Sequence, residues 1–224
     1  MHDVGMRQSV GALVVSVLLA AATGCSDDEP APTSSIAVYL VRDGKVAPVR
    51  RVVEGTEDGR AATAIDALSD GPTAEERDAG YATSLPASLP LELDGAAATV
   101  DGAVSDLGAA QLVNTLSQFP EVDRIVVEGE ELTRQDVDDE TPPIVIESPL
   151  DGDVVTSPVT LRGTANVFEA TVSIEVRDAG GKVVLESFTT ATSGTGTRGT
   201  YETELELPDG ATTIVAFESS AKDG

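Results

Sequence analysis

The side chains that most often carry out covalent chemistry are nearly missing from this sequence. Its 224 residues include one histidine, His2, and one cysteine, Cys25. Nucleophilic catalysis by serine or cysteine normally needs a histidine base, and most zinc sites need histidine ligands. His2 lies in an N-terminal segment that we expect to be removed, and no glycine-rich phosphate loop precedes a predicted helix. We therefore predict no catalytic residue, no metal site and no cofactor.

Carboxylates are the reactive groups present in excess. The chain has 39 acidic and 14 basic residues, which gives a net charge of −25. A pair of carboxylates can hydrolyse a glycosidic bond, and composition leaves this reaction open. Aromatic side chains, which usually line sugar-binding clefts, make up only 3% of the residues. The charge repels phosphate backbones, so we expect no nucleic acid partner. Its simplest role is solubility; cation binding and repulsion from an anionic cell wall are the alternatives.

Cys25 ends a segment with the layout of a secretory signal. Arg7 supplies the positive start, and Val10–Ala22 is an apolar run too short for a comfortable transmembrane helix. The end, Ala22-Thr23-Gly24-Cys25, resembles the lipobox of bacterial lipoproteins, although leucine is usual at the first of these four positions. The resemblance implies that residues 1–25 are a signal peptide and that diacylglycerol is attached to Cys25. Ordinary secretion with a free thiol is the alternative.

This leader predicts a protein on the extracytoplasmic face of the cell membrane, held there by its lipid. Asp3 is unusual so early in a leader, which makes Met6 an alternative to Met1 as the first residue. Residues 26–35 lack the hydrophobic side chains that folding needs, and we interpret them as a disordered tether.

Residues 36–132 have the pattern of a small α/β sandwich, with helices on one face of a sheet. Asp43-Gly44 predicts a hairpin turn, and Gly71-Pro72 predicts a helix end. Ser105–Phe119 carries apolar residues at the i, i+3, i+4, i+7 spacing of one helix face. The expected β-β-α-β-β-α-β elements are strands 36–41 and 46–53, helix 60–68, strands 89–93 and 98–100, helix 105–119 and strand 125–127.

Arg50 and Arg51 are the only adjacent basic pair in the chain, and they lie on the second of these strands. Contact with an anionic ligand or partner is the functional interpretation. An exposed strand face is the simpler one, because surface charges are normally solvated.

Two motifs in this domain resemble the GerMN domain of sporulation and germination lipoproteins. They are Ala67-Leu68-Ser69-Asp70-Gly71-Pro72-Thr73 and Ala110-Gln111-Leu112-Val113-Asn114-Thr115-Leu116. The resemblance covers nearly all of residues 36–132. It implies a fold and no catalysis, because in the family these positions are helix–turn and buried helix-face residues. Family members resemble ring-building modules of secretion assemblies, which implies contact with other proteins.

Residues 133–143 predict an acidic linker that ends in Pro142-Pro143. The run Asp136-Val137-Asp138-Asp139-Glu140 suggests calcium, but it lacks the central glycine and the terminal glutamate of an EF-hand loop. A solvated hinge with few contacts between the two domains is the better interpretation.

Residues 144–224 predict an all-β domain. Val172, Ile174 and Val176 alternate with polar residues, as in half-buried antiparallel strands, and turn signals recur at the spacing of a β-sandwich. The stretch Gly163–Val172 resembles the immunoglobulin-like domain of bacterial spore-germination proteins, which often follows GerMN in one lipoprotein. The whole chain is therefore expected to be α+β. Six strands are expected: about 144–147, 154–162, 171–177, 182–190, 200–207 and 212–218.

The resemblance implies one more strand after Lys222-Asp223-Gly224, so we expect this sandwich to lack its last strand, through truncation or through a partner that supplies it. Phe168 and Glu169 are the candidate partner contacts in this domain. A core role for Phe168 and a turn cap by Glu169 are the simpler interpretation, because aromatic residues dominate small cores.

Three classes of function follow. The first is a non-enzymatic cell-surface binding or assembly module, related to sporulation or germination by resemblance. The others are an enzyme or accessory of wall polysaccharide, and an accessory lipoprotein of a membrane sensor kinase. The expected partners are the membrane, through the lipid on Cys25, and a protein or cell-wall polymer of the envelope.

Overall fold

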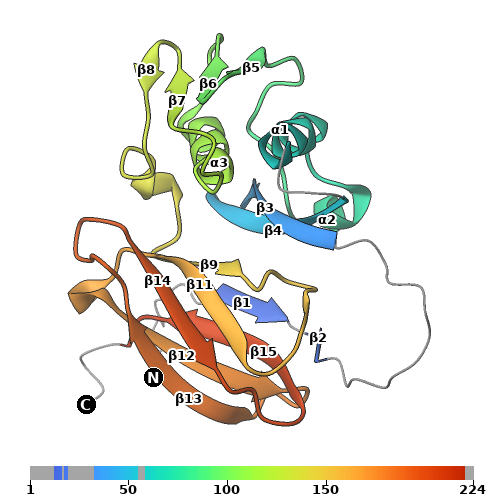
Figure 1. The fold of residues 1–224 in the computed structure, drawn as a ribbon, viewed down its shortest axis with the longest axis vertical. Coiled ribbons are helices and arrows are strands. Elements are labelled where there is room, and N and C mark those ends of the chain that lie inside the picture. Colours follow the sequence, from blue (N-terminus) through green and yellow to red (C-terminus); the bar gives the residue numbers. More distant parts are fainter. Residues whose placement is uncertain (1–12, 17, 20–32, 55–58, 220–224) are drawn as a thin grey trace, which may run out of the picture.

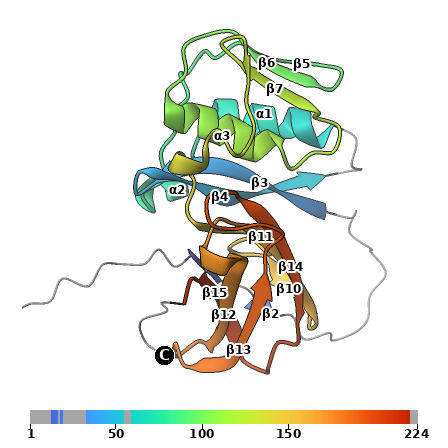
Figure 2. The ribbon, with the colours of Figure 1, turned by 90° about the vertical axis from the view of Figure 1, so that its left-hand side faces the viewer.

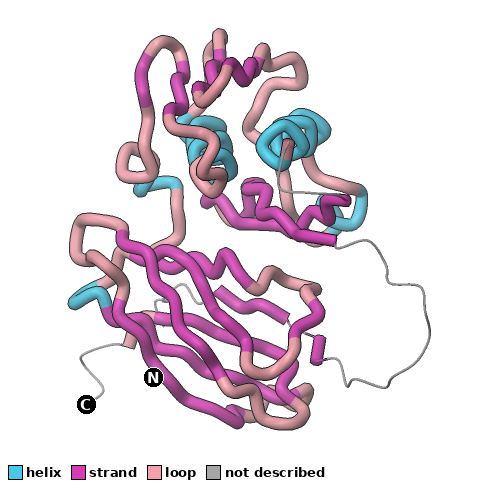
Figure 3. The backbone as a smooth tube through the Cα atoms, in the orientation of Figure 1, coloured by secondary structure: helices cyan, strands magenta, loops and turns pink. Residues whose placement is uncertain are grey.

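The computed structural model describes residues 13–16, 18, 19, 33–54 and 59–219, which form two domains stacked along the long axis (Figure 1). The longer helices belong to the first domain, whereas the second is built almost wholly from strands (Figure 3). Within the described part of the chain, no helix is both long enough and apolar enough to cross a bilayer. The cysteine at position 25 lies outside the described residues.

The first domain has the predicted order of elements, with a short helix and a short strand in addition. Its turn at Asp43-Gly44 has both φ angles positive, at 52° and 75°, as a two-residue hairpin requires. The elements are β3 (Thr33–Arg42), β4 (Lys45–Glu54), α1 (Arg60–Asp70), α2 (Ala74–Asp78), β5 (Leu91–Asp94), β6 (Ala97–Val100), α3 (Asp106–Leu116), β7 (Arg124–Val127) and β8 (Glu130–Glu131).

The arrangement of these elements differs from the expected single sheet. Strands β3 and β4 form one sheet, and β5-β6-β7-β8 form another. Helices α1 and α3 lie between the two sheets rather than on the outer face of one (Figure 2). The domain therefore has three layers, with the helices in the middle.

Side chains of α3 and of the turn directly after it explain why β3 does not continue into a larger sheet. Gln118 accepts a hydrogen bond from the Ala37 N–H at 3.1 Å and donates one to the Ala37 carbonyl at 2.6 Å. Thr115 Oγ1 accepts the Tyr39 N–H at 2.9 Å, and Gln111 Nε2 donates to the Tyr39 carbonyl at 3.0 Å. The helix thus satisfies backbone groups that another strand would otherwise pair.

An isolated β-bridge occupies the same edge of β3 further along the strand. Val41 and Ala82 exchange two backbone hydrogen bonds of 2.8 Å each. Since the polar groups of β3 are already satisfied, β5–β8 pair among themselves on the other side of the helices.

The second domain is a sandwich of two sheets, as predicted. One sheet has the order β14-β11-β9, and the other has the order β1-β15-β12-β13. The predicted strand 154–162 is broken in two, because Pro158 has no N–H to donate. The elements are β9 (Ile144–Ser148), β10 (Val154–Val155), β11 (Val159–Ala165), η2 (Phe168–Ala170), β12 (Thr171–Asp178), β13 (Val183–Thr190), β14 (Gly199–Leu205) and β15 (Ala211–Phe217).

The expected open edge at the last strand is not found in this chain. Strand β15 pairs with β12 on one side and with β1 (Leu13–Ser16) on the other, in antiparallel register. A second short piece, β2 (Leu18–Leu19), pairs with β10. Both pieces belong to the predicted signal peptide, so β15 is covered by a segment that we expect the processed protein to lose.

The prediction that residues 133–143 form a solvated hinge with few contacts is wrong. Residues 138–140 form a short 3-10 helix, η1 (Asp138–Glu140). Val137 and Thr141 are only 3% and 2% exposed. The Thr141 hydroxyl donates to the Val137 carbonyl at 2.9 Å and accepts from Asn114 Nδ2 of α3 at 3.1 Å. Val137 and Thr141 thus pack the segment onto the first domain, and the acidic residues around them obscured this in the sequence.

Strand β9 belongs to both hydrophobic cores. Ile144 and Ile146 face the core of the second domain, whereas Val145 and Leu150 join the core of the first. A strand alternates its side chains between two faces, so β9 is apolar on both. This explains why Ile144, Val145 and Ile146 form an uninterrupted apolar run.

Polar contacts add to this interface between the domains. The Tyr39 hydroxyl donates to Glu147 at 2.7 Å, and Arg134 pairs with the same carboxylate at 2.9 Å. Burial, together with the negative charge of Glu147, raises the pKa of Tyr39 well above its ordinary value. Arg50 reaches Asp153 at 2.5 Å. The domains therefore meet through an apolar strand flanked by ion pairs.

Candidate functional site

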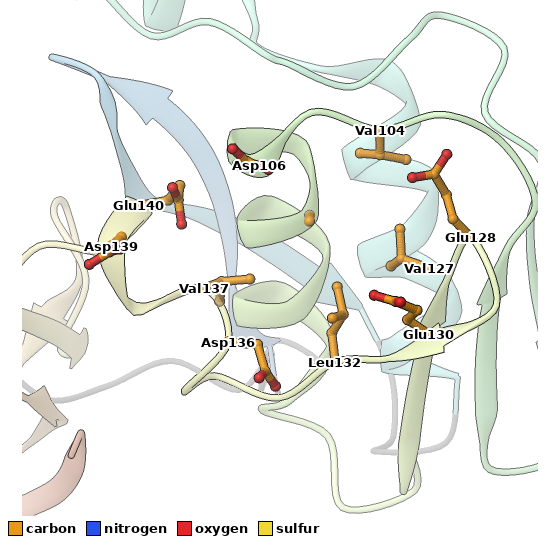
Figure 4. Close-up of a pocket in the computed structure, with 11 residues that line it drawn as sticks. Val104, Asp106, Val127, Glu128, Glu130, Leu132, Asp136, Val137, Asp139 and Glu140 are labelled. Atoms are coloured by element: carbon orange, nitrogen blue, oxygen red, sulfur yellow. The ribbon is translucent and has the colours of Figure 1, made fainter. Parts of the chain in front are cut away.

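A groove of about 690 Å³ opens on the first domain beside α3 (Figure 4). Its walls come from the start of α3, the end of β7, strand β8 and the segment that follows β8. The lining residues are Val104, Asp106, Ala109, Val127, Glu128, Glu130, Leu132, Asp136, Val137, Asp139 and Glu140.

The apolar part of the lining is continuous with the core of the domain. Val127 and Val137 are 5% and 3% exposed. Val104, Ala109 and Leu132 are partly buried against the same core. The apolar floor is thus fixed by core packing and exposes little area, so the surface that the groove offers to a ligand is mainly polar.

Six carboxylates surround this floor, and no lysine, arginine or histidine lines the groove. Asp106 opens α3 directly after its N-cap Ser105, where the helix dipole favours a negative charge. Glu128 adopts a positive φ of 53° and its N–H donates to the Val100 carbonyl at 3.1 Å. Glu128 and Glu130 lie on one side of α3, and Asp139 and Glu140 on the other (Figure 4). The negative potential therefore extends along the whole groove.

Among the carboxylates of the groove, Asp136 has the clearest hydrogen-bond donors beside it in the chain. It accepts the Thr133 N–H at 2.8 Å and the Thr133 hydroxyl at 2.6 Å. These hydrogen bonds lower the pKa of Asp136, so its charge is maintained into mildly acidic conditions.

The carboxylates are spread along the groove rather than gathered at one point. Within the described part of the chain, no group of three or more His, Cys, Asp or Glu side chains could hold a metal ion. Lys45, the first residue of β4, lies nearby and donates to the backbone carbonyl of Asp139. The arrangement suits several separate cationic side chains better than one ion.

Two protein-family models match the chain. Residues 37–133 match the family described as sporulation and spore germination, and residues 143–224 match the immunoglobulin-like domain of bacterial spore germination. The chain therefore carries a GerMN-type domain of the sporulation and germination family, followed by an immunoglobulin-like domain of the spore-germination type. The family resemblance predicted from its motifs is thereby confirmed.

Comparison with solved structures found the tandem GerMN domains of the sporulation protein GerM from Bacillus subtilis. That match has 20% sequence identity and a TM-score of 0.36, and it covers 50% of this chain and 44% of the other. No similar sequence was found among the curated proteins.

The arginine pair of the GerMN-type domain is already engaged within the protein. Arg50 forms its ion pair with Asp153 of the immunoglobulin-like domain. Arg51 forms a two-pronged pair with Glu76, in which Nη2 lies 2.8 Å from Oε2. Both charges therefore stabilise the fold, and their role as contacts for an anionic partner stays a prediction.

Phe168 of the immunoglobulin-like domain does not plug the core, because 61% of it is exposed. The preceding residue, Val167, is buried in its place. Glu169 has a positive φ of 54°, and the cap at this turn is Glu218, whose carboxylate accepts the Phe168 N–H at 2.7 Å. The predicted core role of Phe168 and cap role of Glu169 are therefore wrong, and a partner contact by either residue stays a prediction.

The groove itself was missed by the sequence analysis. Glu130 and Asp136 were assigned to the end of a domain and to a hinge, and Asp106 to the start of a helix. Only the fold brings α3 beside the segment after β8. The sequence held one indication of this packing. Leu132 and Val137 are apolar residues within an acidic stretch, and a solvated linker does not need apolar side chains.

Proposed function

We propose that this protein is a non-enzymatic binding module, held by lipid on the outer face of the cell membrane, which binds a basic segment of another envelope protein in the acidic groove beside α3. The observation that carries the proposal is the set of six carboxylates around a small apolar floor, with no basic residue among the described residues that line the groove. Interfaces of this kind join an apolar centre to a charged rim.

Charge supports this choice of partner. The net charge of −25 creates a field that attracts basic proteins and speeds their encounter with the groove. An extended basic segment with aliphatic residues can place lysine or arginine against Glu128, Glu130 and Asp139. Its aliphatic side chains can cover Val104 and Leu132.

The groove offers little to the alternative of a wall-polysaccharide enzyme. Its lining contains no aromatic side chain on which a sugar ring could stack, and no histidine. Turnover of purified peptidoglycan that is lost on changing one groove carboxylate would favour the enzyme instead. No contact in the structure favours a sensor kinase over other envelope proteins.

The membrane location in the proposal rests on the leader and Cys25. Two acyl chains on one cysteine give firm anchoring, since each buried CH₂ contributes about 0.8 kcal/mol. The expected tether of residues 26–35 is too long, because Thr33–Ser35 pair with β4 as part of β3. In this proposal, residues 26–32 separate the folded domains from the bilayer.

The proposal is tested by comparing two double variants in co-purification from solubilised envelopes. Glu128→Gln with Glu130→Gln neutralises one wall of the groove. Glu92→Gln with Glu204→Gln removes the same charge from exposed strands elsewhere. We expect the groove variant to lose about tenfold in affinity for its partner, with binding that also weakens as salt rises. The control pair should bind like the unmodified protein. Equal loss in both variants would show a general charge effect and contradict the groove.

A further inference from the structure

Three of the four phenylalanines in the chain lie at one end of the second domain, outside its core. Phe168 and Phe188 are 61% and 69% exposed, and Phe217 is partly exposed. The fourth, Phe119, is 4% exposed in the first domain. Only 3% of this chain is aromatic, so leaving most of its phenylalanine in water has no explanation in core packing.

The strand register places two of these rings in one row. Ser173 of β12 pairs with Phe188 of β13 on one side and with Phe217 of β15 on the other. All three belong to the outer face, because the alternating residues Val172 and Ile174 are buried. The small Ser173 side chain, whose hydroxyl lies 2.6 Å from that of Ser219, separates the two phenylalanines in this row.

Phe168 stands beside the same row. The residue after Phe217 is Glu218, whose carboxylate holds the Phe168 N–H at 2.7 Å. Antiparallel pairing brings the start of β12 to the ends of β13 and β15. The Phe168 turn is therefore built at the end of the sheet where this row lies.

The surroundings of these phenylalanines are negatively charged. Glu169 and Glu186 are exposed, and Glu218 is partly exposed. The nearest cation in the register is Arg177, whose guanidinium is already bound to Glu175 at 2.6 Å. Phenylalanine faces attract cations, and the negative field of nearby carboxylates attracts cationic segments to the same place.

We propose that Phe168, Phe188 and Phe217 form a second docking surface, which binds an arginine- or lysine-containing segment of a partner protein by stacking its cations on the rings. Charge complementarity selects this occupant, since the ring of carboxylates repels an anionic bilayer as well as acidic proteins. The surface belongs to the second domain and does not depend on the acidic groove of the first.

A labelled synthetic peptide in which arginine alternates with leucine is a direct probe for this surface. Fluorescence anisotropy with the full-length protein measures its affinity. The test variants are Phe188→Ser and Phe168→Ser, and the matched control is Val52→Ser, which removes another exposed apolar side chain from a strand of the first domain. We expect each phenylalanine variant to bind about fivefold more weakly or worse, with Val52→Ser unchanged.

The groove variant Glu128→Gln with Glu130→Gln separates the two proposals. If the peptide binds only the groove, that variant loses all binding and the phenylalanine variants lose none. This result would contradict the aromatic docking surface and leave the groove proposal standing. Vesicles of phosphatidylcholine or phosphatidylglycerol that bind the protein through Phe188 would also overturn it, in favour of a membrane contact. Thermal unfolding checks that the variants are correctly folded, since replacing such exposed side chains should leave the melting temperature unchanged.

Discussion

Glu76 illustrates how a single carboxylate organises its surroundings. It accepts the N–H of Thr73 at 2.7 Å and pairs with Arg51, while the Thr73 side chain accepts the Glu76 N–H at 3.2 Å. This capping box starts α2 and ties it to β4. Burial alone would raise the pKa of Glu76, but the hydrogen bonds from Arg51 and Thr73 outweigh it and lower the pKa.

A lowered pKa in the folded state makes the contribution of Glu76 depend on pH. Its stabilisation is present above the unfolded pKa of about 4.3 and is lost as pH falls through the lower folded value. We predict that Glu76→Gln reduces the free energy of unfolding by about 1 kcal/mol at pH 7 and by much less at pH 3. Urea denaturation of both proteins across this range measures it, with Glu92→Gln as control. A difference independent of pH would contradict this role.

At the residue level, the sequence did not predict the partners of the residues it singled out. Arg50 and Arg51 were proposed as an exposed strand face or as contacts for an anionic ligand, but they form ion pairs with acidic residues from elsewhere in the fold. Phe168 was assigned to the core because aromatic side chains usually lie there. Val167 fills that position instead, and a shift of one residue along an extended chain reverses which side chain is buried.

Helix α3 shows what periodicity can and cannot predict at the level of elements. Its apolar face and its end near Pro120 follow from spacing. The polar residues Gln111 and Thr115, at 0% exposure, do not, because their partners are backbone groups of β3. Those contacts divide the strands into two sheets, so the order of elements was predictable and the layering was not.

Thr115→Val tests the blocked edge of β3. The substitution keeps the shape of the side chain and removes the acceptor for the Tyr39 N–H. We predict a loss of about 1–3 kcal/mol in the free energy of unfolding, because a buried donor is left unpaired. Chemical denaturation measures it. Thr156→Val on an exposed turn is the control, and an equal effect in both would contradict the role of the edge.

Strand β15 leads to another prediction at this level. Its register with Leu13–Ser16 protects the backbone between Thr213 and Ala216. A chain that lacks residues 1–24 should exchange amide hydrogens of β15 faster on that edge, while those of β12 stay protected. Hydrogen exchange with mass spectrometry compares the two chains. Unchanged exchange in β15 would mean that the pairing contributes nothing to protection.

For the whole molecule, the segment between the domains acts as a joint and not as a loose hinge. The Arg198 side chain, 3% exposed, donates to Asp138 at 2.6 Å and to the Pro142 carbonyl at 2.8 Å. Asp138 also accepts from Asn166 at 2.6 Å. These contacts fix η1 between the two domains, and the composition of residues 133–143 gave no sign of them because Arg198 is distant in sequence.

The joint predicts resistance to proteolysis where a hinge would be cut. A glutamate-specific protease should cleave slowly after Glu140 in the unmodified protein. Arg198→Met leaves Asp138 without its cation, so we predict about 2–4 kcal/mol lower stability and faster cleavage at that site. The control is Arg162→Met, whose pair with Glu202 is exposed. Rapid cleavage of the unmodified chain after Glu140 would contradict the joint and support a flexible hinge.

Anchoring is also a property of the whole molecule. Cys25→Ser should release the protein from the membrane fraction into the medium, because the lipid is the expected attachment. Fractionation and immunoblotting measure the distribution. A variant that remains with the membrane would contradict a lipid anchor on Cys25.

The most direct test of the account is site-specific photo-crosslinking in intact cells. A photoreactive amino acid at Ala109 places the reactive group in the acidic groove, and the same residue at Ala179 places it on an exposed hairpin of the second domain. We predict a discrete adduct with one basic envelope protein from Ala109, reduced by Glu128→Gln with Glu130→Gln, and none from Ala179. The same adduct from both positions would contradict the groove as the binding site. An adduct from Ala109 that is not reduced by Glu128→Gln with Glu130→Gln would contradict it as well.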